Sequence, residues 1–296
     1  MAKNPVKNLR IAFFGTPDVA VHVLSSLKAA GIVPTLIVAA PDRPAGRGLR
    51  TTPPPASQWA HAEGVDVVQP EKISAEFIGE LQNSEWDLFI VAAYGQILPK
   101  TLLAIPRKGT LNVHPSLLPK LRGASPIETA ILTDAKDAVG VTIMLMDDKM
   151  DHGPIVSQAR VELEEWPPSA RVLRALLSSE GGNLLAETIP EWVAGSITPE
   201  EQDHANATFS KKFEKGDAEI DLPAEGHASR EEGWKNFLKI RAFDTSPRAF
   251  FFKEQNGKKI RVIVTDAEFE NGTLKITRVI PEGKKEMPYA AFLKSR

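Results

Sequence analysis

Two polar side chains with complementary chemistry stand two positions apart in residues 111–127, which read LNVHPSLLPKLRGASPI. Asn112 and His114 follow an apolar run, and alternate residues of a strand point to one side of a sheet. Histidine exchanges a proton near neutral pH, and an asparagine amide can donate to an oxygen that gains negative charge. The spacing indicates acyl-group chemistry at a strand end, although an Asn that caps a turn beside a half-buried His fits the same spacing.

The loop after these residues is expected to form one wall of a site. Pro115 ends the predicted strand, and residues 115–126 are rich in proline and glycine, which predicts an irregular loop. A helix is predicted from about Ile127 to Thr133. In open α/β sheets, ligands bind beyond the carboxyl ends of the strands, so this loop lies where a site is expected.

The surrounding chain predicts a Rossmann-like, mostly parallel α/β sheet. A buried strand at residues 9–14, a helix at 18–30 and a strand at 34–40 form a β-α-β unit. The predicted elements that continue the pattern are helices at 56–63, 75–83 and 169–193, and strands at 65–68, 87–93, 139–146 and 155–161. The first turn, Gly15-Thr16-Pro17-Asp18, lacks the G-x-G-x-x-G pattern, so we expect no dinucleotide cofactor.

Residues 41–55 contain five prolines, two glycines and three arginines. This segment is too polar to pack in a core and too rich in proline for a helix or a strand. It is therefore predicted to be a loop, and loops of this length are either functional or disordered. A solvated surface loop and a binding loop both fit the composition.

The pattern of predicted elements changes near residue 207, from alternating strands and helices to short strands. This change predicts a second, smaller domain. The expected division is an α/β domain at 1–194, a polar linker at 195–206 and a domain at 207–296. Short strands at 259–264, 268–269 and 273–280, with Asn-Gly turns, predict a small antiparallel barrel. Residues 207–296 contain 18 Lys and Arg against 14 Asp and Glu, a net of +4, which leaves −6 for residues 1–206. This asymmetry permits contact between the second domain and nucleic acid.

Composition limits the class of protein. The chain has 296 residues, 42% of them hydrophobic, and no cysteine. Disulfides, thiolate nucleophiles and cysteine metal sites are therefore excluded. The first ten residues lack the apolar segment of a secretory signal, and no apolar run approaches the length of a membrane span. We expect a soluble cytoplasmic protein without membrane contact.

Several motifs together resemble one enzyme family. Residues 112–127 resemble the NxHxSLLPxxRGxxP motif of the formyltransferases that use 10-formyl-tetrahydrofolate. Residues 140–147 (GVTIMLMD) and 150–155 (MDHGPI) resemble the next block of that family, in which an Asp completes the catalytic set. Residues 14–18 (FGTPD) and 41–48 (PDRPAGRG) are similar to the methionyl-tRNA formyltransferase branch. The resemblance covers nearly the whole chain.

The resemblance implies formyl transfer to the amino group of methionyl-initiator tRNA, a step of protein biosynthesis that prepares translation initiation. Asn112 would then hold the oxyanion. His114 would stabilise it and help to move the amine proton to the leaving folate nitrogen. Asp151 would orient His114, pair with its charge or relay the proton through water. No metal is required, and a monomer is expected.

The same resemblance implies binding residues and an OB-like fold for the second domain. The residues expected to contact the folate co-substrate are Tyr94, Gln96, Ile97, Leu98, Ser116, Leu117, Leu118, Pro119 and Asp147. Those expected to contact the tRNA substrate are Phe14, Gly15, Thr16, Pro17, Arg43, Arg47 and Arg50. The sequence departs from the family pattern at residues 148–150 and His152 beside the site, and at residues 243–248 in the second domain.

Three other functions remain open at this point. A sugar-nucleotide N-formyltransferase would share the three catalytic side chains and the SLLPxxRG loop. A hydrolase that releases formate would need neither the 41–55 loop nor a barrel. A non-catalytic RNA-binding protein is disfavoured because Asn112, His114 and Asp151 are all present. The remaining histidines, His22, His61, His152, His204 and His227, are scattered in the sequence and are expected at the surface, with His152 next to the site.

Overall fold

The computed structural model describes residues 6, 8–45, 50–222, 229–255 and 257–294. Contacts divide the chain into two compact units. The first consists of residues 1–122, 139–162 and 174–209, and the second of residues 123–138, 163–173 and 210–296. Each unit has a sheet of its own.

The first unit is organised around a mixed sheet that, in the described part of the chain, has seven strands in the order β10-β9-β7-β6-β1-β2-β5. Five strands are parallel: β1 Ile11–Gly15, β2 Leu36–Val38, β5 Asp66–Val68, β6 Leu88–Ala92 and β7 Thr110–His114. Strand β9 (Gly140–Leu145) runs antiparallel to β7, and β10 (Ile155–Arg160) runs antiparallel to β9. The predicted Rossmann-like sheet is confirmed.

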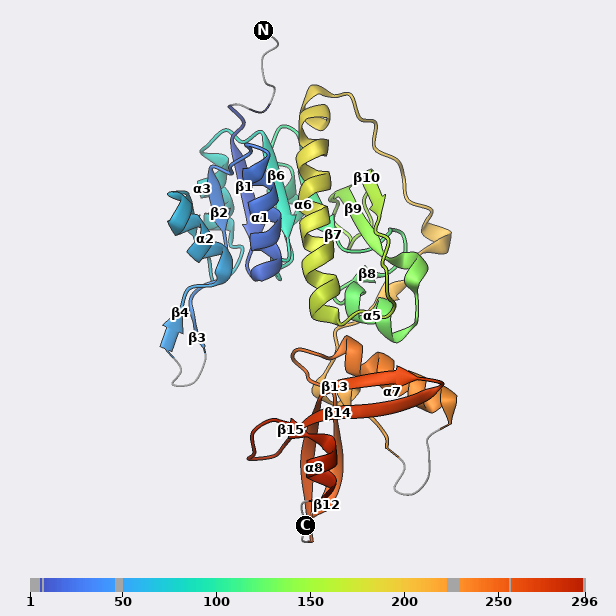
Figure 1. Cartoon of the computed structure of the whole chain (residues 1–296). Coiled ribbons are helices and arrows are strands. Elements are labelled where there is room, and N and C mark those ends of the chain that lie inside the picture. Colours follow the sequence, from blue (N-terminus) through green and yellow to red (C-terminus); the bar gives the residue numbers. More distant parts are fainter. Residues whose placement is uncertain (1–5, 7, 46–49, 223–228, 256, 295–296) are drawn as a thin grey trace. The chain divides into compact units, whose positions relative to one another are not determined.

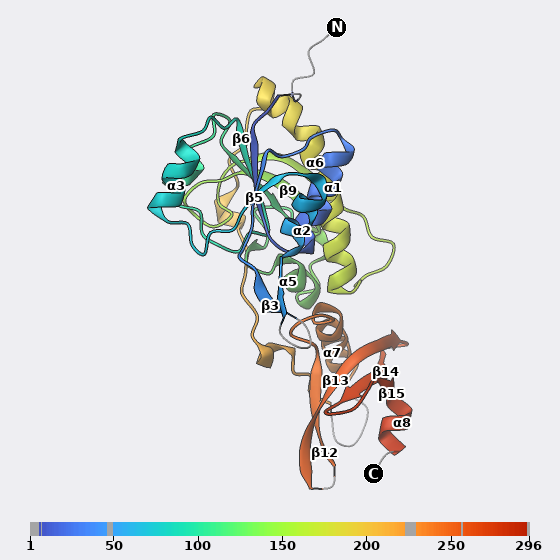
Figure 2. The same cartoon turned by 90° about the vertical axis from the view of Figure 1, so that its left-hand side faces the viewer.

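Helices cover both faces of this sheet (Figures 1 and 2). Helices α1 (Asp18–Ala29), α2 (Pro55–Glu63) and α6 (Ala170–Ala194) lie on one side, and α3 (Ala75–Gln82) lies on the other. The short helix α4 spans Lys100–Leu103. Helix α6 approaches the strands closely, since a Cβ on Gly181 would collide with Val113 of β7. The central strands are therefore covered on both sides.

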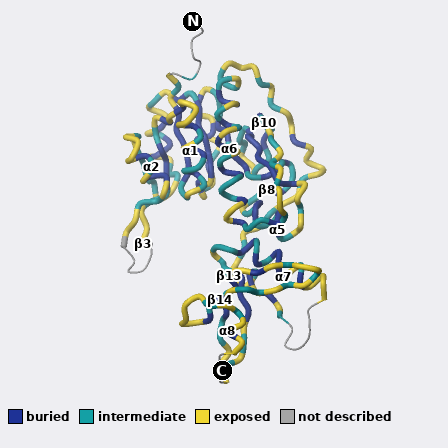
Figure 3. Tube along the Cα trace, viewed as in Figure 1, coloured by how far each residue is buried: buried dark blue, intermediate teal, exposed yellow. Residues whose placement is uncertain are grey.

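This covering explains why the central strands are runs of apolar residues without alternation. Every residue of β1 and of β6 is buried (Figure 3). Burial of such strands is the main favourable term in folding, because apolar surface leaves water. The polar residues that follow these strands are thereby held at the edge of a rigid core.

The prediction of an irregular loop at 41–55 is wrong. Strands β3 (Arg43–Ala45) and β4 (Arg50–Thr52) pair antiparallel, and α2 begins at Pro55. Proline is tolerated in such a pair because each strand has only one neighbour, so Pro44 needs to donate no hydrogen bond on its free side. Residues 46–49, which join the two strands, lie outside the described residues.

The second unit contains a four-stranded antiparallel sheet in its described part, in the order β12-β13-β14-β15. The strands are β12 Phe250–Gln255, β13 Lys258–Glu270, β14 Thr273–Pro281 and β15 Met287–Pro288, and the helices are α5 Pro126–Leu132, α7 Arg230–Ala242 and α8 Tyr289–Lys294. The predicted small β domain is confirmed, and its closure into an OB-like barrel stays a prediction. The remaining short elements are β8 Arg122–Gly123, η1 Lys136–Ala138, η2 His204–Asn206, β11 Phe209–Ser210 and η3 Lys215–Ala218.

One strand assignment in this unit is wrong. Residues 259–264 and 268–269 belong to a single strand, β13, and not to two. The pairing of β13 with β14 shifts register around Asp266, and a bulge of this kind lets a strand continue through polar residues. The turn after it is as predicted, with Asn271 and Gly272 at φ of 51° and 79°, the signs that a tight hairpin turn requires.

Candidate active site

Strand β7 places the two polar side chains that the sequence singled out. It includes both Asn112 and His114 and ends before Pro115. Asn112 lies in register with Val91 of β6, and His114 lies opposite Thr142 of β9. Because two residues of one strand separated by a single position share a face, both side chains lie on the same side of the sheet. The predicted strand end is confirmed.

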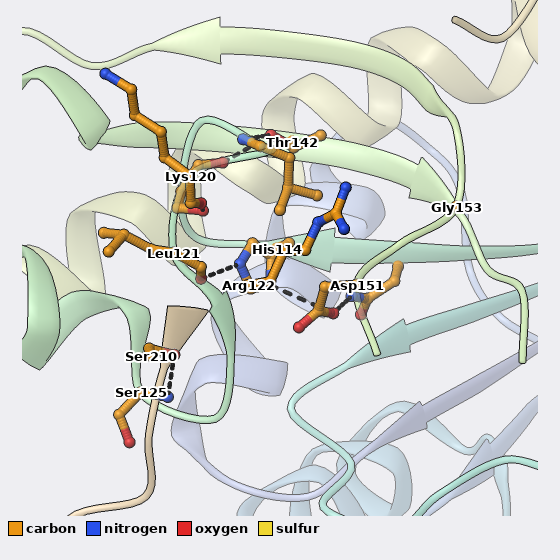
Figure 4. Close-up of polar contacts among 12 residues, drawn as sticks. His114, Lys120, Leu121, Arg122, Ser125, Thr142, Asp151, Gly153 and Ser210 are labelled. Carbon is orange, nitrogen blue, oxygen red and sulfur yellow. Dashed lines mark hydrogen bonds and ion pairs between the residues drawn. The ribbon is translucent and has the colours of Figure 1, made fainter. Parts of the chain in front are cut away.

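Asp151, which is 39 residues further along the chain, meets both side chains at one oxygen (Figure 4). Its Oδ1 accepts from Asn112 Nδ2 at 3.5 Å and lies 3.6 Å from His114 Nδ1. Asp151 has a φ of 49°, in the left-handed region that Asp tolerates better than most residues. The structure thus brings the three expected catalytic residues together in the first unit.

The other ring nitrogen of His114, Nε2, contacts a backbone carbonyl. His114 Nε2 lies 3.0 Å from the carbonyl oxygen of Leu121 (Figure 4). A carbonyl only accepts, so this contact requires the proton on Nε2. His114 is buried, and its Nδ1 lies on the side of Asp151.

A hydroxyl from β9 holds the SLLP segment in place. Thr142 Oγ1 donates to the carbonyl of Ser116 at 2.6 Å and accepts from the Leu118 N–H at 3.1 Å. Gln158 Nε2 donates to the same hydroxyl and to the Leu118 carbonyl. The Ser116 hydroxyl donates to the Lys120 carbonyl. These bonds engage backbone groups of the loop, which fixes its course beside His114.

Histidines outside the predicted catalytic set also meet here. His152 Nδ1 lies 2.6 Å from Asp147 Oδ2, and the ring stacks on His204 with centroids 4.1 Å apart. His204 Nδ1 accepts from an Arg122 guanidinium nitrogen at 2.8 Å. His204 is exposed, as expected for a surface histidine, but it also contacts the site, because its segment folds back onto it. His152 and His204 are 52 positions apart in the sequence, so no periodic pattern could have predicted that their rings stack.

Gln202 is the residue that sequence reasoning missed. It lies in the segment predicted to be a linker, yet it is 4% exposed. Its Oε1 accepts from Arg122 Nε at 3.0 Å and from a terminal nitrogen of the same guanidinium at 2.7 Å. Its Nε2 donates to the carbonyls of Asp151 and Gly153 at 3.0 and 2.7 Å. Gln202 stands alone in a polar stretch of the sequence, and no sequence motif includes it. The sequence therefore contains no signal that this residue belongs to the site.

The turn after β6 stands beside Asn112, because β6 and β7 are paired. Tyr94 is 4% exposed and packs edge-on against Phe14, and burial raises the pKa of its hydroxyl to about 12. Leu98 is buried as well, whereas Ile97 is 86% exposed. Of the residues expected to contact folate in this turn, Ile97 thus offers a free apolar side chain, and Gln96 is half-buried.

The residues expected to contact tRNA have different environments. Phe14 is fully buried and Gly15 has no room for a Cβ, so only their backbone is available. Thr16 Oγ1 donates to the Tyr94 carbonyl and accepts from the Ala40 N–H, which ties together three strand ends. Arg43 pairs with Glu71 at 2.6 Å. The remaining residues of this set are Pro17, which caps α1, Arg50, whose backbone lies in β4, and Arg47, which lies outside the described residues.

The sequence of the chain is similar to those of known proteins. The formyl transferase family profile matches residues 9–189. A methionyl-tRNA formyltransferase of Chloroflexus aurantiacus is 42% identical over 90% of this chain and 82% of its own length. One from Bacillus subtilis is 36% identical over 96% and 94% of the two chains.

Solved structures share the fold at lower identity. A sugar N-formyltransferase of a Shewanella species has a TM-score of 0.60 at 19% identity, over 85% of this chain and 95% of that one. A phosphoribosylglycinamide formyltransferase of Bacillus halodurans has a TM-score of 0.51 at 24% identity, over 63% and 96%. The profile, the two relatives and the fold together show that the chain belongs to the formyl transferase family, in the group of the methionyl-tRNA formyltransferases.

Proposed function

We propose that this protein transfers the formyl group of 10-formyl-tetrahydrofolate to the amino group of methionyl-initiator tRNA, for translation initiation. The observation that carries the proposal is the convergence of Asn112 and His114 on one oxygen of Asp151, at 3.5 and 3.6 Å. A relative named methionyl-tRNA formyltransferase aligns with nearly the whole chain, which supports the choice of substrate.

The first step is attack of the neutral amine on the formyl carbon. The carbonyl oxygen gains negative charge as the new C–N bond forms, and the Asn112 amide can donate to it. Loss of one such donor typically raises the barrier by about 3–4 kcal/mol. In the described structure this amide faces Asp151 at 3.5 Å, which is near the limit of a hydrogen bond, and catalytic contacts commonly tighten once substrate is bound.

The second step moves a proton from the attacking amine to the nitrogen that leaves. His114 Nε2 already donates to the Leu121 carbonyl, so Nδ1 is the nitrogen that takes and returns this proton. The Asp151 carboxylate, 3.6 Å away, stabilises the imidazolium that forms when Nδ1 is protonated. In this proposal each ring nitrogen has a separate task, Nε2 a structural one and Nδ1 a catalytic one.

The folate co-substrate supplies the formyl group. The turn at residues 94–98 and the segment 116–119 would hold it, together with Asp147. Two observations fit this assignment: Ile97 exposes 86% of its apolar surface, and the turn follows β6, the strand paired with the one that carries Asn112. An exposed apolar side chain beside polar backbone groups suits a flat heterocycle with a hydrogen-bonding edge.

The tRNA substrate would contact two basic regions. Residues 41–55 of the sequence include Arg43, Arg47 and Arg50, and arginine is suited to phosphate recognition. Residues 207–296 carry a net charge of +4 and include the antiparallel sheet. We assign chemistry to residues 1–194, connection to 195–206 and tRNA binding to 207–296, in a cytoplasmic monomer. In the described residues, no helix has the length and apolar character of a membrane span.

A sugar-nucleotide N-formyltransferase is the second candidate, because solved structures of that kind share the fold over most of both chains. The deciding experiment offers purified protein 10-formyl-tetrahydrofolate with methionyl-initiator tRNA, with an amino-sugar nucleotide, or with neither. Formylation of the tRNA alone supports the proposal, and formylation of the nucleotide alone overturns it. Formate release without an acceptor would indicate a hydrolase.

A further inference from the structure

We infer that Gln202 is a positioning residue for the proposed formyl transfer and that it acts by fixing the backbone of the Asp151 turn. Gln202 lies in residues 195–209, a segment of the first unit that follows helix α6. No motif of the family resemblance includes it. It does not contact Asn112 or His114 in any described hydrogen bond, and its direct bonds to the Asp151 turn place its effect at Asp151.

The carboxamide of Gln202 uses its full hydrogen-bonding capacity. Its oxygen accepts two bonds from Arg122, and its nitrogen donates both protons, one to the Asp151 carbonyl and one to the Gly153 carbonyl. A primary amide has two donors and two acceptor lone pairs. Because Gln202 is 4% exposed, water cannot readily replace a missing partner, and an unpaired group would be costly.

The bonds of Gln202 join the two chain segments that hold the catalytic pair. Arg122 directly follows Leu121, whose carbonyl fixes Nε2 of His114. On the other side, Gln202 holds the backbone carbonyl of Asp151 itself and that of Gly153, two residues further on. The distance between His114 Nδ1 and Asp151 Oδ1 therefore depends on this one side chain.

The segment that carries Gln202 is itself fixed to the same two regions. Thr208 accepts from the Leu121 N–H with its hydroxyl and from the Arg122 N–H with its carbonyl, both at 2.9 Å. Glu200 exchanges two backbone hydrogen bonds with Ile155 at 2.7 and 2.8 Å. Gln202 is thus held from both sides, and its amide is preorganised to restrain the turn.

The turn at Asp151 needs such restraint. Asp151 has a positive φ of 49°, and Gly153 lies so close to Leu145 that a Cβ would collide with the Leu145 carbonyl. A non-glycine residue in the left-handed region persists when surrounding contacts over-determine it. The two hydrogen bonds from Gln202 to the Asp151 and Gly153 carbonyls supply that constraint.

The test replaces Gln202 by Glu in the full-length protein. A carboxylate still accepts from Arg122, but it has no N–H for the Asp151 and Gly153 carbonyls. We expect kcat to fall by roughly a hundredfold, the effect of a misplacement of about 1 Å, while KM for each substrate changes less than about twofold. Thr188→Val, which removes a buried hydroxyl that bonds within α6, is the control for general loss of stability and should keep kcat.

A double-mutant cycle identifies the route of the effect. On an Asp151→Asn background, Gln202→Glu should lower kcat by less than about threefold, because a positioning residue has no effect once the group it positions has lost its role. Equal losses on both backgrounds, or a wild-type kcat in Gln202→Glu, would overturn the inference. Gln202→Met, which removes the donors and the acceptor without adding a charge, should also lower kcat, which would show that the new charge of Gln202→Glu is not the cause.

The cycle is independent of which acceptor the enzyme uses. If the wild-type protein formylates an amino-sugar nucleotide and not methionyl-tRNA, the proposed function fails, and the same cycle can be measured with the nucleotide. If methionyl-tRNA is formylated and the variants behave additively, the proposed function stands and the role of Gln202 fails.

Discussion

At the residue scale, His114 is defined by the different partners of its two nitrogens. The Leu121 carbonyl holds the proton on Nε2, at 3.0 Å, and Asp151 faces Nδ1. Burial keeps water from competing for either contact. The ring is therefore fixed in orientation and tautomer before a substrate binds, which is the condition for efficient proton transfer.

The first prediction concerns Asn112 and His114 as one catalytic unit. His114→Ala should lower kcat by about 10²–10⁴ and Asn112→Ala by about 10²–10³. The double variant should lose less than the product of the two losses, because both act on one transition state. Steady-state formylation of methionyl-tRNA gives kcat, and thermal unfolding shows that folding is intact. The exposed His61 is the matched control for histidine removal. A His114→Ala protein with near-normal kcat would contradict the assignment.

The second prediction follows from the raised pKa of Tyr94, about 12 against a usual 10.0. Above pH 10 the unfolded chain loses the phenolic proton while the folded chain keeps it. Stability that is fully present below pH 10 should therefore fall as pH rises towards about 12, by roughly 1.4 kcal/mol per pH unit. Tyr94→Phe removes this contribution.

Urea unfolding of wild type and Tyr94→Phe at several pH values between about 9 and 12 tests this sign. The wild-type stability should decline more steeply than that of the variant. The Tyr94 hydroxyl is buried with no hydrogen-bond partner among the described residues, so the substitution should cost little near neutral pH. Parallel curves would show that the hydroxyl is hydrated in solution.

At the scale of elements, the site depends on three connections: the loop after β7, the turn between β9 and β10, and the segment after α6. Hydrogen bonds from Thr142, Gln158 and Gln202 hold their backbones. These connections carry Asp151 and Gln202, while the paired strands supply the rigid frame and β7 carries Asn112 and His114.

The third prediction compares two glycines. Gly153→Ala should destabilise the protein by about 1–3 kcal/mol, because the added Cβ collides with the Leu145 carbonyl and the backbone must shift. Gly79→Ala in α3 meets no atom within 4 Å and should stabilise by roughly 0.5–1 kcal/mol, because a helical glycine is entropically unfavourable. Chemical denaturation of both variants measures the difference. Equal effects of the two substitutions would contradict the crowding at Gly153.

The fourth prediction concerns the β3–β4 hairpin. Arg43→Ala should lower kcat/KM for methionyl-tRNA by roughly threefold, the effect of about one phosphate contact, without weakening folate binding. Glu71→Ala is the matched control, since it removes the carboxylate that pairs with Arg43 at 2.6 Å and leaves the guanidinium free for phosphate. A parallel fall in folate affinity would place the hairpin at the folate site.

At the scale of the whole molecule, the two parts of the chain differ in net charge. Residues 1–206 have a net charge of −6 and residues 207–296 have +4. In the β domain, Lys259 lies over the ring of Phe252 at 4.4 Å, and Phe252 is 40% exposed. A cation beside an exposed aromatic face is a combination that nucleic-acid-binding surfaces use.

The fifth prediction tests this surface. The double variant Lys258→Gln, Lys259→Gln should bind tRNA more weakly, and the slope of log affinity against log salt should become shallower by roughly one to two. Lys28→Gln, Lys100→Gln makes the same change of charge in the first unit and should leave the slope nearly unchanged. Affinity at several salt concentrations gives both slopes. If the two variants behave alike, the β domain has another task.

The sequence by itself determined the α/β class, the end of β7 and the three candidate catalytic residues that the structure brings together. These features depend on local patterns: apolar runs for buried strands, a period of two for side chains on one face, and a long contiguous motif at 112–127. The sequence also showed the difference in net charge between the two parts of the chain, and it predicted the turn at Asn271-Gly272. Such signals need no knowledge of which distant segments meet.

Only the tertiary structure decided the contacts between distant segments. The β3–β4 hairpin forms through pairing that overrides a composition typical of loops, and β13 continues across polar residues because its partner strand can shift register. Gln202 and His204 reach the site because residues 195–209 fold back along the first unit. Hydrogen bonds between residues 50 or 80 positions apart leave no periodic trace in a sequence, because their geometry depends on how the whole chain packs.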